Sequence, residues 1–236
     1  MGSVKVKSMD EKSKEIKEIE NQIEDALWSL ELHDEIEKAL GIYREAETKL
    51  GALDITTEEP AYTEQQRVLA YCLMRQSNLL RQMGKSEEAF VLGEREIAAA
   101  RASKDEITLA RSLMSNGTNR IIAGEVEKGL ELIDGAREIF EGGGSYDHQQ
   151  GLGWYWILQA DLANAGIIER EPAVILEITG RALTILKPIE NWPGVARAYA
   201  ARVKAHERMG NEEDATGDRK EQQYYESKIE TEDNAG

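Results

Sequence analysis

Cysteine, proline and aromatic residues are scarce in this chain of 236 residues. The single cysteine, Cys72, excludes an intrachain disulfide and is typical of a reducing compartment. Only 4 prolines and 6% aromatic residues leave an aliphatic, alanine-rich composition that favours helices. Basic residues are outnumbered as well, since 29 Lys and Arg against 45 Asp and Glu give a net charge of −16. This balance argues against a general affinity for nucleic acid or for an anionic membrane.

Long hydrophobic runs are also missing. The uncharged stretch Gly151–Ala160 is too short and too polar to cross a bilayer. The first residues, Met1–Lys7, contain no apolar signal core and do not fit the myristoylation pattern. Hydrophobic residues still make up 41% of the chain, which is enough to bury a sizeable core. The sequence therefore predicts a soluble cytoplasmic protein.

A helical run, a glycine, a short acidic segment and a second helical run recur along the chain. The recurring glycines, spaced by 40, 42 and 44 residues, are Gly84, Gly124, Gly166 and Gly210. Glycine adopts the left-handed conformation that ends a helix, and acidic residues favour the start of the next helix. We expect the small residues Ala89, Gly129 and Ala215, five positions after their glycines, to let the two helices approach closely. Each unit is then an antiparallel helix pair that buries its apolar face by stacking on its neighbours.

The pattern resembles the tetratricopeptide repeat, in the longer variety of about forty residues per repeat. The positions that carry the resemblance are Leu73, Ser77, Leu80, Gly84, Ala89, Leu113, Gly117, Gly124, Gly129, Ile133, Ala136, Tyr199, Gly210 and Ala215. Three positions depart from the pattern: Asn116 and Arg120 replace apolar residues, and Gly93 replaces an aromatic residue. The resemblance implies a non-catalytic scaffold for protein and peptide recognition, in which the first helix of each pair lines a concave groove.

The predicted architecture is all-α: a right-handed α-solenoid of about five antiparallel helix pairs, forming a single domain over residues 9–230. The pairs are expected at residues 9–50, 62–103, 105–141, 148–187 and 193–230. We expect residues 1–8 to be a flexible N-terminus and residues 231–236 to be a frayed tail.

Residues that could carry chemistry do not form a recognisable constellation. The histidines His33, His148 and His206 lie in different repeats, and none has a second His or Cys at metal-ligand spacing. Cys72 has no sequence neighbour that would lower its pKa, so a buried, unreactive thiol is expected. The sequence therefore predicts no catalytic residue, no metal site and no cofactor.

The distribution of charge is more informative. The first helices of the last four predicted pairs carry a net charge of +6, whereas their second helices carry −9. If the first helices line a concave groove, that groove is basic and attracts an acidic or extended peptide of a partner protein. The resemblance implies which positions of the first helices face the peptide: Tyr71, Met74, Asn78, Arg81, Arg111, Met114, Thr118, Trp156, Asn164, Arg197, Lys204 and Arg208.

Two alternatives remain open from the sequence. Arg75, Arg120 and Arg202 can instead bond acidic residues of adjacent helices and tie the repeats together. The chain can also be a structural protein that forms a homo-oligomer or joins a larger complex without a peptide ligand. Trp154 and Trp156 are about 200° apart on a helix, so one is expected in the core and the other exposed in the groove or at such an interface. An all-α enzyme is the least favoured reading.

Overall fold

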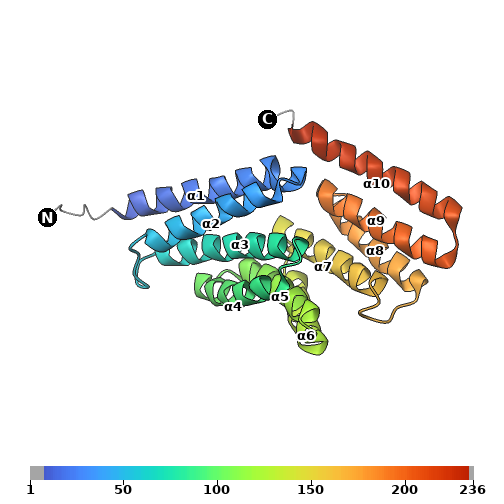
Figure 1. The fold of residues 1–236 in the computed structure, drawn as a ribbon, viewed down its shortest axis with the longest axis horizontal. Coiled ribbons are helices and arrows are strands. Elements are labelled where there is room, and N and C mark those ends of the chain that lie inside the picture. The colour runs from blue at the N-terminus through green and yellow to red at the C-terminus, as the bar shows by residue number, and fades with distance from the viewer. Residues whose placement is uncertain (1–7, 234–236) are drawn as a thin grey trace. The chain divides into compact units, whose positions relative to one another are not determined.

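The computed structural model describes residues 8–233, with side chains up to residue 229. This part of the chain contains ten α-helices and no strand, which confirms the predicted all-α class (Figure 1). The helices are α1 (Met9–Ser29), α2 (Ile36–Ala52), α3 (Ala61–Gln82), α4 (Ser86–Ser103), α5 (Glu106–Ile122), α6 (Val126–Glu141), α7 (Tyr146–Asn164), α8 (Pro172–Leu186), α9 (Trp192–Met209) and α10 (Glu212–Asp233). A short 3-10 turn, η1 (Glu31–His33), connects α1 to α2.

The helix ends differ slightly from the predicted boundaries at both termini. Ser8 is ordered as the cap of α1, where its hydroxyl accepts from the backbone N–H of Glu11 and the Glu11 side chain accepts from the Ser8 N–H. Helix α10 continues to Asp233. The remaining parts of the expected flexible ends, residues 1–7 and 234–236, lie outside the described residues.

The turn within each pair is built in the same way throughout the chain. The recurring glycines have φ values of 73°, 87°, 72° and 73° at Gly84, Gly124, Gly166 and Gly210. The residue after each glycine donates its N–H to the carbonyl five residues earlier, at 2.8–3.0 Å. In the first pair Asp34, with a φ of 61°, takes the place of glycine. The glycine spacing therefore predicted a repeated Schellman-type helix end.

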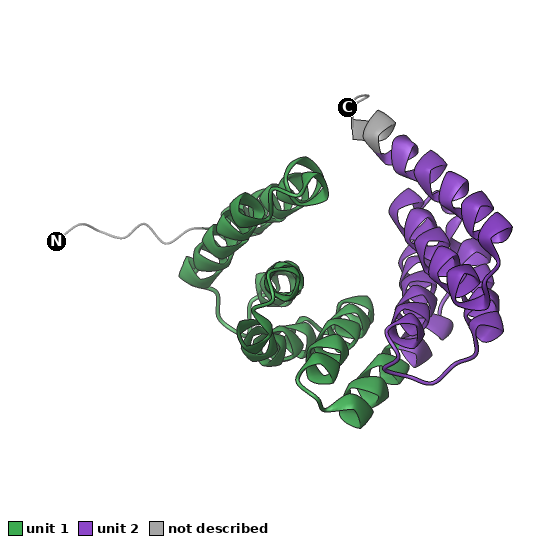
Figure 2. Ribbon diagram, turned by 45° about the vertical axis from the view of Figure 1, so that its right-hand side comes forward, with its two compact units in different colours: residues 1–136 green, residues 137–236 purple. Residues whose placement is uncertain are grey.

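The chain divides into two compact units, residues 1–136 and 137–236 (Figure 2). In each unit the main contacts join helices that are neighbours or next-but-one neighbours in sequence. That arrangement is the one expected of stacked helix pairs. The single domain expected from the repeats stays a prediction.

The core of unit 1 begins with an apolar cluster from α1, α2 and α3. Ile16, Ile23, Tyr43 and Leu79 are fully buried in it. The buried Tyr43 hydroxyl donates to Glu31 at 2.8 Å. Burial and the Glu31 charge raise the pKa of Tyr43 well above its ordinary value.

Helices α5 and α6 approach closely at two glycines. A Cβ atom on Gly129 would lie 2.5 Å from the carbonyl oxygen of Gly117, and one on Gly117 would lie 2.6 Å from the carbonyl oxygen of Gly129. The corresponding small residues of other pairs, Ala89 and Ala215, are fully buried. The expected close approach is therefore confirmed at Gly129, and at Ala89 and Ala215 it stays a prediction.

The core of unit 2 contains Ile157, Leu186 and Val195 from α7, α8 and α9. Trp154 and Trp156 are both half-buried and both pack against this cluster, so the expected division into one core and one exposed tryptophan was wrong. Although the two tryptophans point to different sides of α7, both reach apolar neighbours, because α7 contacts both α8 and α9.

The last two helices of unit 2 are joined by stacked aromatic rings. The Tyr225 ring of α10 lies 5.5 Å from the Trp192 ring and 5.8 Å from the Tyr199 ring, measured between centroids. The ammonium groups of Lys187 and Lys228 lie 5.2 and 5.9 Å from the centre of the Tyr225 ring. Cation–π attraction therefore adds to the packing of α10.

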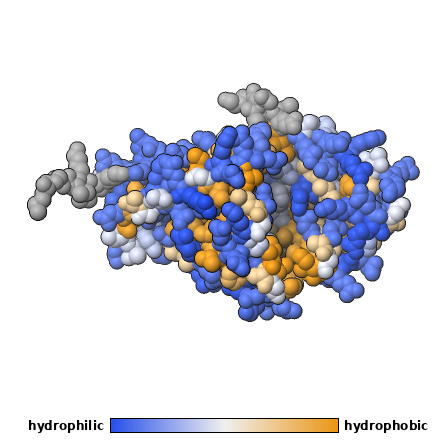
Figure 3. Space-filling model, in the orientation of Figure 1, coloured by the Kyte–Doolittle hydropathy of each residue, from blue (hydrophilic) through white to orange (hydrophobic). Residues whose placement is uncertain are grey.

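Figure 3 shows apolar residues exposed among hydrophilic ones on one face of the molecule. Across the described residues, we find no helix with the length and hydrophobicity that crossing a membrane requires.

Candidate functional site

The strongest candidate surface is a row of cations on α9 in unit 2. Helix α9 starts where the Asn191 side chain accepts from the Gly194 N–H at 3.0 Å, and it ends at Gly210. Arg197, Lys204 and Arg208 are exposed on this helix. Their spacings of seven and four residues place all three on one side of α9, over a length of about 16 Å at 1.5 Å per residue.

Helix α7 lies beside this row and forms the other side of the candidate surface. Arg197 forms an ion pair with Asp161 at 3.0 Å, and Arg208 donates to the carbonyl of Ala163 at 3.3 Å. The Asn164 amide donates to the carbonyl of Ala201 at 2.9 Å. The fold thus brings together four predicted residues of unit 2, namely Asn164, Arg197, Lys204 and Arg208.

Trp156, the fifth predicted residue in unit 2, is placed differently. Its ring packs against the apolar clusters that α7 forms with α8 and α9. The Arg181 guanidinium of α8 lies 5.1 Å from its ring centre. Trp156 therefore contributes chiefly to the packing of unit 2, and a role in binding a peptide stays a prediction.

The predicted residues of unit 1 are all half-buried on α3 and α5. They are Tyr71, Met74, Asn78, Arg81, Arg111, Met114 and Thr118. Burial raises the pKa of Tyr71, and the charges of Arg75 and Arg111 oppose that rise, so these groups lie near one another. The Thr118 hydroxyl donates to the Met114 carbonyl of its own helix at 2.9 Å.

Several cations of unit 1 are neutralised by acidic side chains. Arg67 pairs with Glu20 at 2.7 Å, and Arg75 pairs with the buried Glu31. These pairs reduce the positive charge that the sequence predicted for the first helices of unit 1.

The alternative role considered for three arginines agrees with the observed geometry. Arg75 joins α3 to the η1 turn, as described above. Arg120 of α5 bonds Glu94 of α4 and Glu125, each at 2.5 Å. Arg202 of α9 bonds Asp218 of α10 at 2.9 Å. All three arginines tie helices together.

Sequence reasoning missed a buried polar layer in unit 1. Arg81 donates to Asn119 at 2.5 Å, to Ser77 at 3.3 Å and to Asn78. The Asn119 amide donates in turn to Ser77 at 2.9 Å and to the Ala89 carbonyl at 3.0 Å. Burial lowers the pKa of Arg81 to about 10. Arg81 therefore holds α3 to α5 instead of standing free in a groove.

The same layer continues to a buried carboxyl group, Glu96, which is 0% exposed. The Ser115 hydroxyl donates to Glu96 Oε2 at 3.0 Å. Gly93 leaves room for the layer, because a Cβ atom there would lie 2.5 Å from the Asn116 amide nitrogen. The departures from the repeat pattern at Gly93 and Asn116 were the signal that could have revealed this layer.

Other reactive groups are placed as follows. Cys72 is fully buried, donates to the Tyr43 carbonyl at 3.0 Å, and has its pKa raised to about 12 by burial. His148 lies 2.7 Å from the Ser145 hydroxyl, whereas His206 is buried with its Nε2 3.4 Å from Asp218. Within residues 8–229 no group of three His, Cys, Asp or Glu residues could hold a metal ion.

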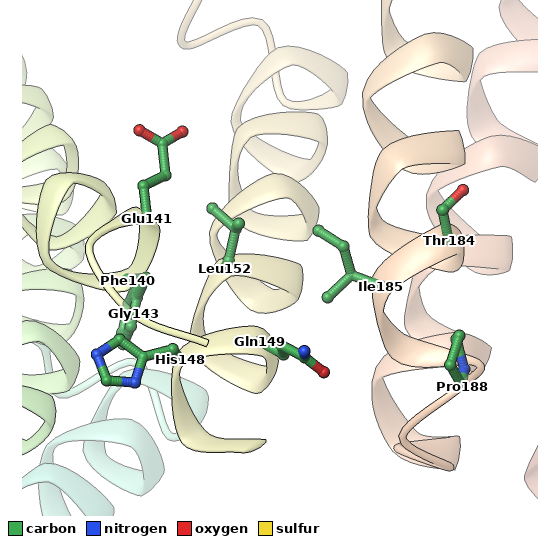
Figure 4. A pocket seen from close by; sticks show the side chains of 9 residues that line it. All are labelled: Phe140, Glu141, Gly143, His148, Gln149, Leu152, Thr184, Ile185 and Pro188. Carbon is green, nitrogen blue, oxygen red and sulfur yellow. The ribbon is translucent and has the colours of Figure 1, made fainter. Parts of the chain in front are cut away.

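A pocket of about 400 Å³ lies in unit 2, between the end of α6, the start of α7 and α8 (Figure 4). Its lining residues are Phe140, Glu141, Gly143, His148, Gln149, Leu152, Thr184, Ile185 and Pro188. Figure 4 shows Glu141 and His148 on the same side of the pocket, with the Glu141 carboxylate pointing away from the His148 ring.

Comparison with known proteins identifies the fold. No protein-family model and no curated protein sequence matches the chain. Among solved structures, BtubC (BKLC) from P. vanneervenii aligns over 95% of this chain and 93% of its own, with 13% identity and a TM-score of 0.56. A putative kinesin light chain with nearly identical TPR-like repeats, from Podosopora anserina, aligns over 94% and 97%, with 13% identity and a TM-score of 0.51. The chain therefore has the all-α solenoid fold of tetratricopeptide-like repeat proteins.

Proposed function

We propose that this chain is a non-catalytic interaction scaffold, and that the α9 face of unit 2 binds an acidic, extended segment of a partner protein. The observation that carries the proposal is the exposed row formed by Arg197, Lys204 and Arg208 on one side of α9, in which Arg197 also pairs with Asp161. A chain with a net charge of −16 repels most anions at long range, so an exposed local row of cations favours one surface over the rest. Arginine is suited to this role because its planar guanidinium binds a carboxylate at two points.

The test compares two single lysine substitutions of equal charge in the same unit. Lys204 lies in the row, whereas Lys220 is exposed on α10. Binding of a fluorescent oligo-glutamate peptide is measured by anisotropy at low and high salt for wild type, Lys204→Glu and Lys220→Glu. We expect Lys204→Glu to weaken binding by about 1 kcal/mol, roughly fivefold in Kd, and salt to weaken wild-type binding.

Equal effects of the two substitutions would refute the assignment to α9, because they would show a response to net charge alone. Absence of any peptide binding by wild type would refute the acidic-ligand proposal. Thermal unfolding is measured in parallel, and both variants are expected to unfold within about 0.5 kcal/mol of wild type, since exposed side chains rarely contribute more.

Self-assembly remains the competing function. A large apolar patch involving Trp154 or Trp156 would favour it, and in the structure both rings are half-buried and pack against the core of unit 2. Sedimentation velocity tests this alternative directly: a concentration-dependent oligomer without peptide binding would replace the proposed function.

A further inference from the structure

Glu96 is the most unusual side chain of unit 1, because it is a fully buried carboxyl group without a partner of opposite charge in hydrogen-bond contact. It lies on α4, facing α5, and its Oε2 atom accepts from Ser115. Its Oε1 atom is buried and has no hydrogen-bond partner in the described part of the chain. Burying a carboxylate in this position costs a large desolvation free energy, whereas burying a neutral carboxyl group costs far less.

The groups that face Glu96 come from two neighbouring helices. Helix α5 presents the hydroxyls of Ser112 and Ser115, and both favour the ionised form by hydrogen bonding. Helix α3 presents Arg81, whose positive charge also favours that form. Arg81 is the one charged group among residues 8–229 that alters the pKa of Glu96, and its donors are already bonded within α3 and to α5.

The surrounding layer leaves little freedom to relieve a new charge. Asn116, buried on α5 beside Gly93, directs its Oδ1 atom to Arg120 at 3.1 Å, and its Nδ2 atom has no hydrogen-bond partner in the described residues. Asn119 is committed to Ser77 and to the Ala89 carbonyl. Ionisation of Glu96 therefore requires water entry between α4 and α5, or a rearrangement of Arg81 or of the unpartnered Asn116 amide.

We propose that Glu96 and the polar layer around it form a protonation switch in unit 1. With its carboxyl protonated, α4 stays packed on α3 and α5; loss of the proton loosens α4 from both helices. This inference is independent of the peptide surface proposed on α9, because every residue it uses lies in unit 1.

The direction of the pH dependence follows from the position of the carboxyl. Burial raises the pKa of Glu96 from 4.5 to about 8, and the two serines and Arg81 only partly offset that rise. Between pH 4.5 and about pH 8, Glu96 releases its proton when α4 is open but keeps it when α4 is packed. The packed state therefore loses stability as the pH rises through this range. The equilibrium between open and packed α4 changes by up to tenfold per pH unit across this window and levels off above it.

Hydrogen exchange of the full chain, read by mass spectrometry, tests the switch. After correction for intrinsic exchange rates, protection of α4 amides in wild type is expected to fall by up to roughly 80-fold between pH 6 and pH 8.5. Amides of α8 in unit 2, a helix without histidine, provide the internal control and should change far less. Glu96→Gln keeps the shape but does not titrate, so its α4 protection should stay constant over the same range.

A second variant keeps the test decisive if Glu96→Gln does not fold. Ser115→Ala removes the hydroxyl that stabilises the ionised carboxyl, so the loss of α4 protection should level off at a higher pH than in wild type. Wild-type α4 protection that is independent of pH would overturn the proposal. The same fall in Glu96→Gln as in wild type would overturn it as well.

Discussion

The close approach of α5 and α6 makes a sharp prediction for two glycines of the same helix. In Gly129→Ala the new Cβ atom would lie 2.5 Å from the Gly117 carbonyl oxygen and 2.6 Å from Ile121 Cγ1. The first contact is with backbone, so no change of side-chain rotamer relieves it and the helices must move apart. Overpacking of this kind costs about 1–3 kcal/mol or more, against a gain of about 1 kcal/mol from the helix preference of alanine.

Gly135→Ala is the matched control on α6. A Cβ atom there would meet only Leu113 Cδ1, at 3.9 Å, which is an ordinary contact. This variant should therefore be stabilised by about 0.5–1 kcal/mol. The assay is urea unfolding at equilibrium followed by circular dichroism, with the two alanine variants expected to differ by about 2 kcal/mol in unfolding free energy. Equal stabilisation of both variants would refute the close contact between α5 and α6.

Three further predictions concern unit 1. Arg75→Met should lower the unfolding free energy by about 3–5 kcal/mol, because it leaves Glu31 buried without its cation. Denaturant titration measures the loss, and a change under about 1 kcal/mol would contradict a buried ion pair. Lys104→Gly should raise the unfolding free energy by about 1 kcal/mol, because Lys104 has a φ of 59°, which strains a residue other than glycine. Lys85→Gly, at a φ of −89°, should not be stabilised. Thermal melts of both variants test the prediction, and equal melting temperatures would contradict it. Cys72 should be alkylated by iodoacetamide far more slowly in the folded protein than in urea, since burial raises its pKa to about 12; equal rates by mass spectrometry would show that the thiol is accessible.

The helix pairs were predictable because their determinants are local. Glycine at Gly84, Gly124 and Gly210 is needed for a positive φ, and that requirement is visible in the sequence itself. The close packing at Gly129 was predictable for the same reason, since a small residue recurs at a fixed distance from each turn.

The candidate site was predictable only in part. The resemblance to the repeat family implied that Arg197, Lys204 and Arg208 are groove positions, and in the structure all three are exposed on one side of α9. For Arg81, however, the sequence did not reveal that its guanidinium donates to Asn119 of α5 and Asn78 of α3. Glutamate is usually exposed, so the residue type of Glu96 does not indicate its burial, which comes from the tertiary contact with α5.

The pattern of helix contacts also has a consequence for how the chain folds. Because the main contacts join neighbours or next-but-one neighbours in sequence, each step of assembly closes only a short loop. Proteins dominated by such local contacts fold in microseconds to milliseconds, far faster than proteins whose strands pair over long distances. A nascent chain of this kind can acquire native structure pair by pair as its residues become available.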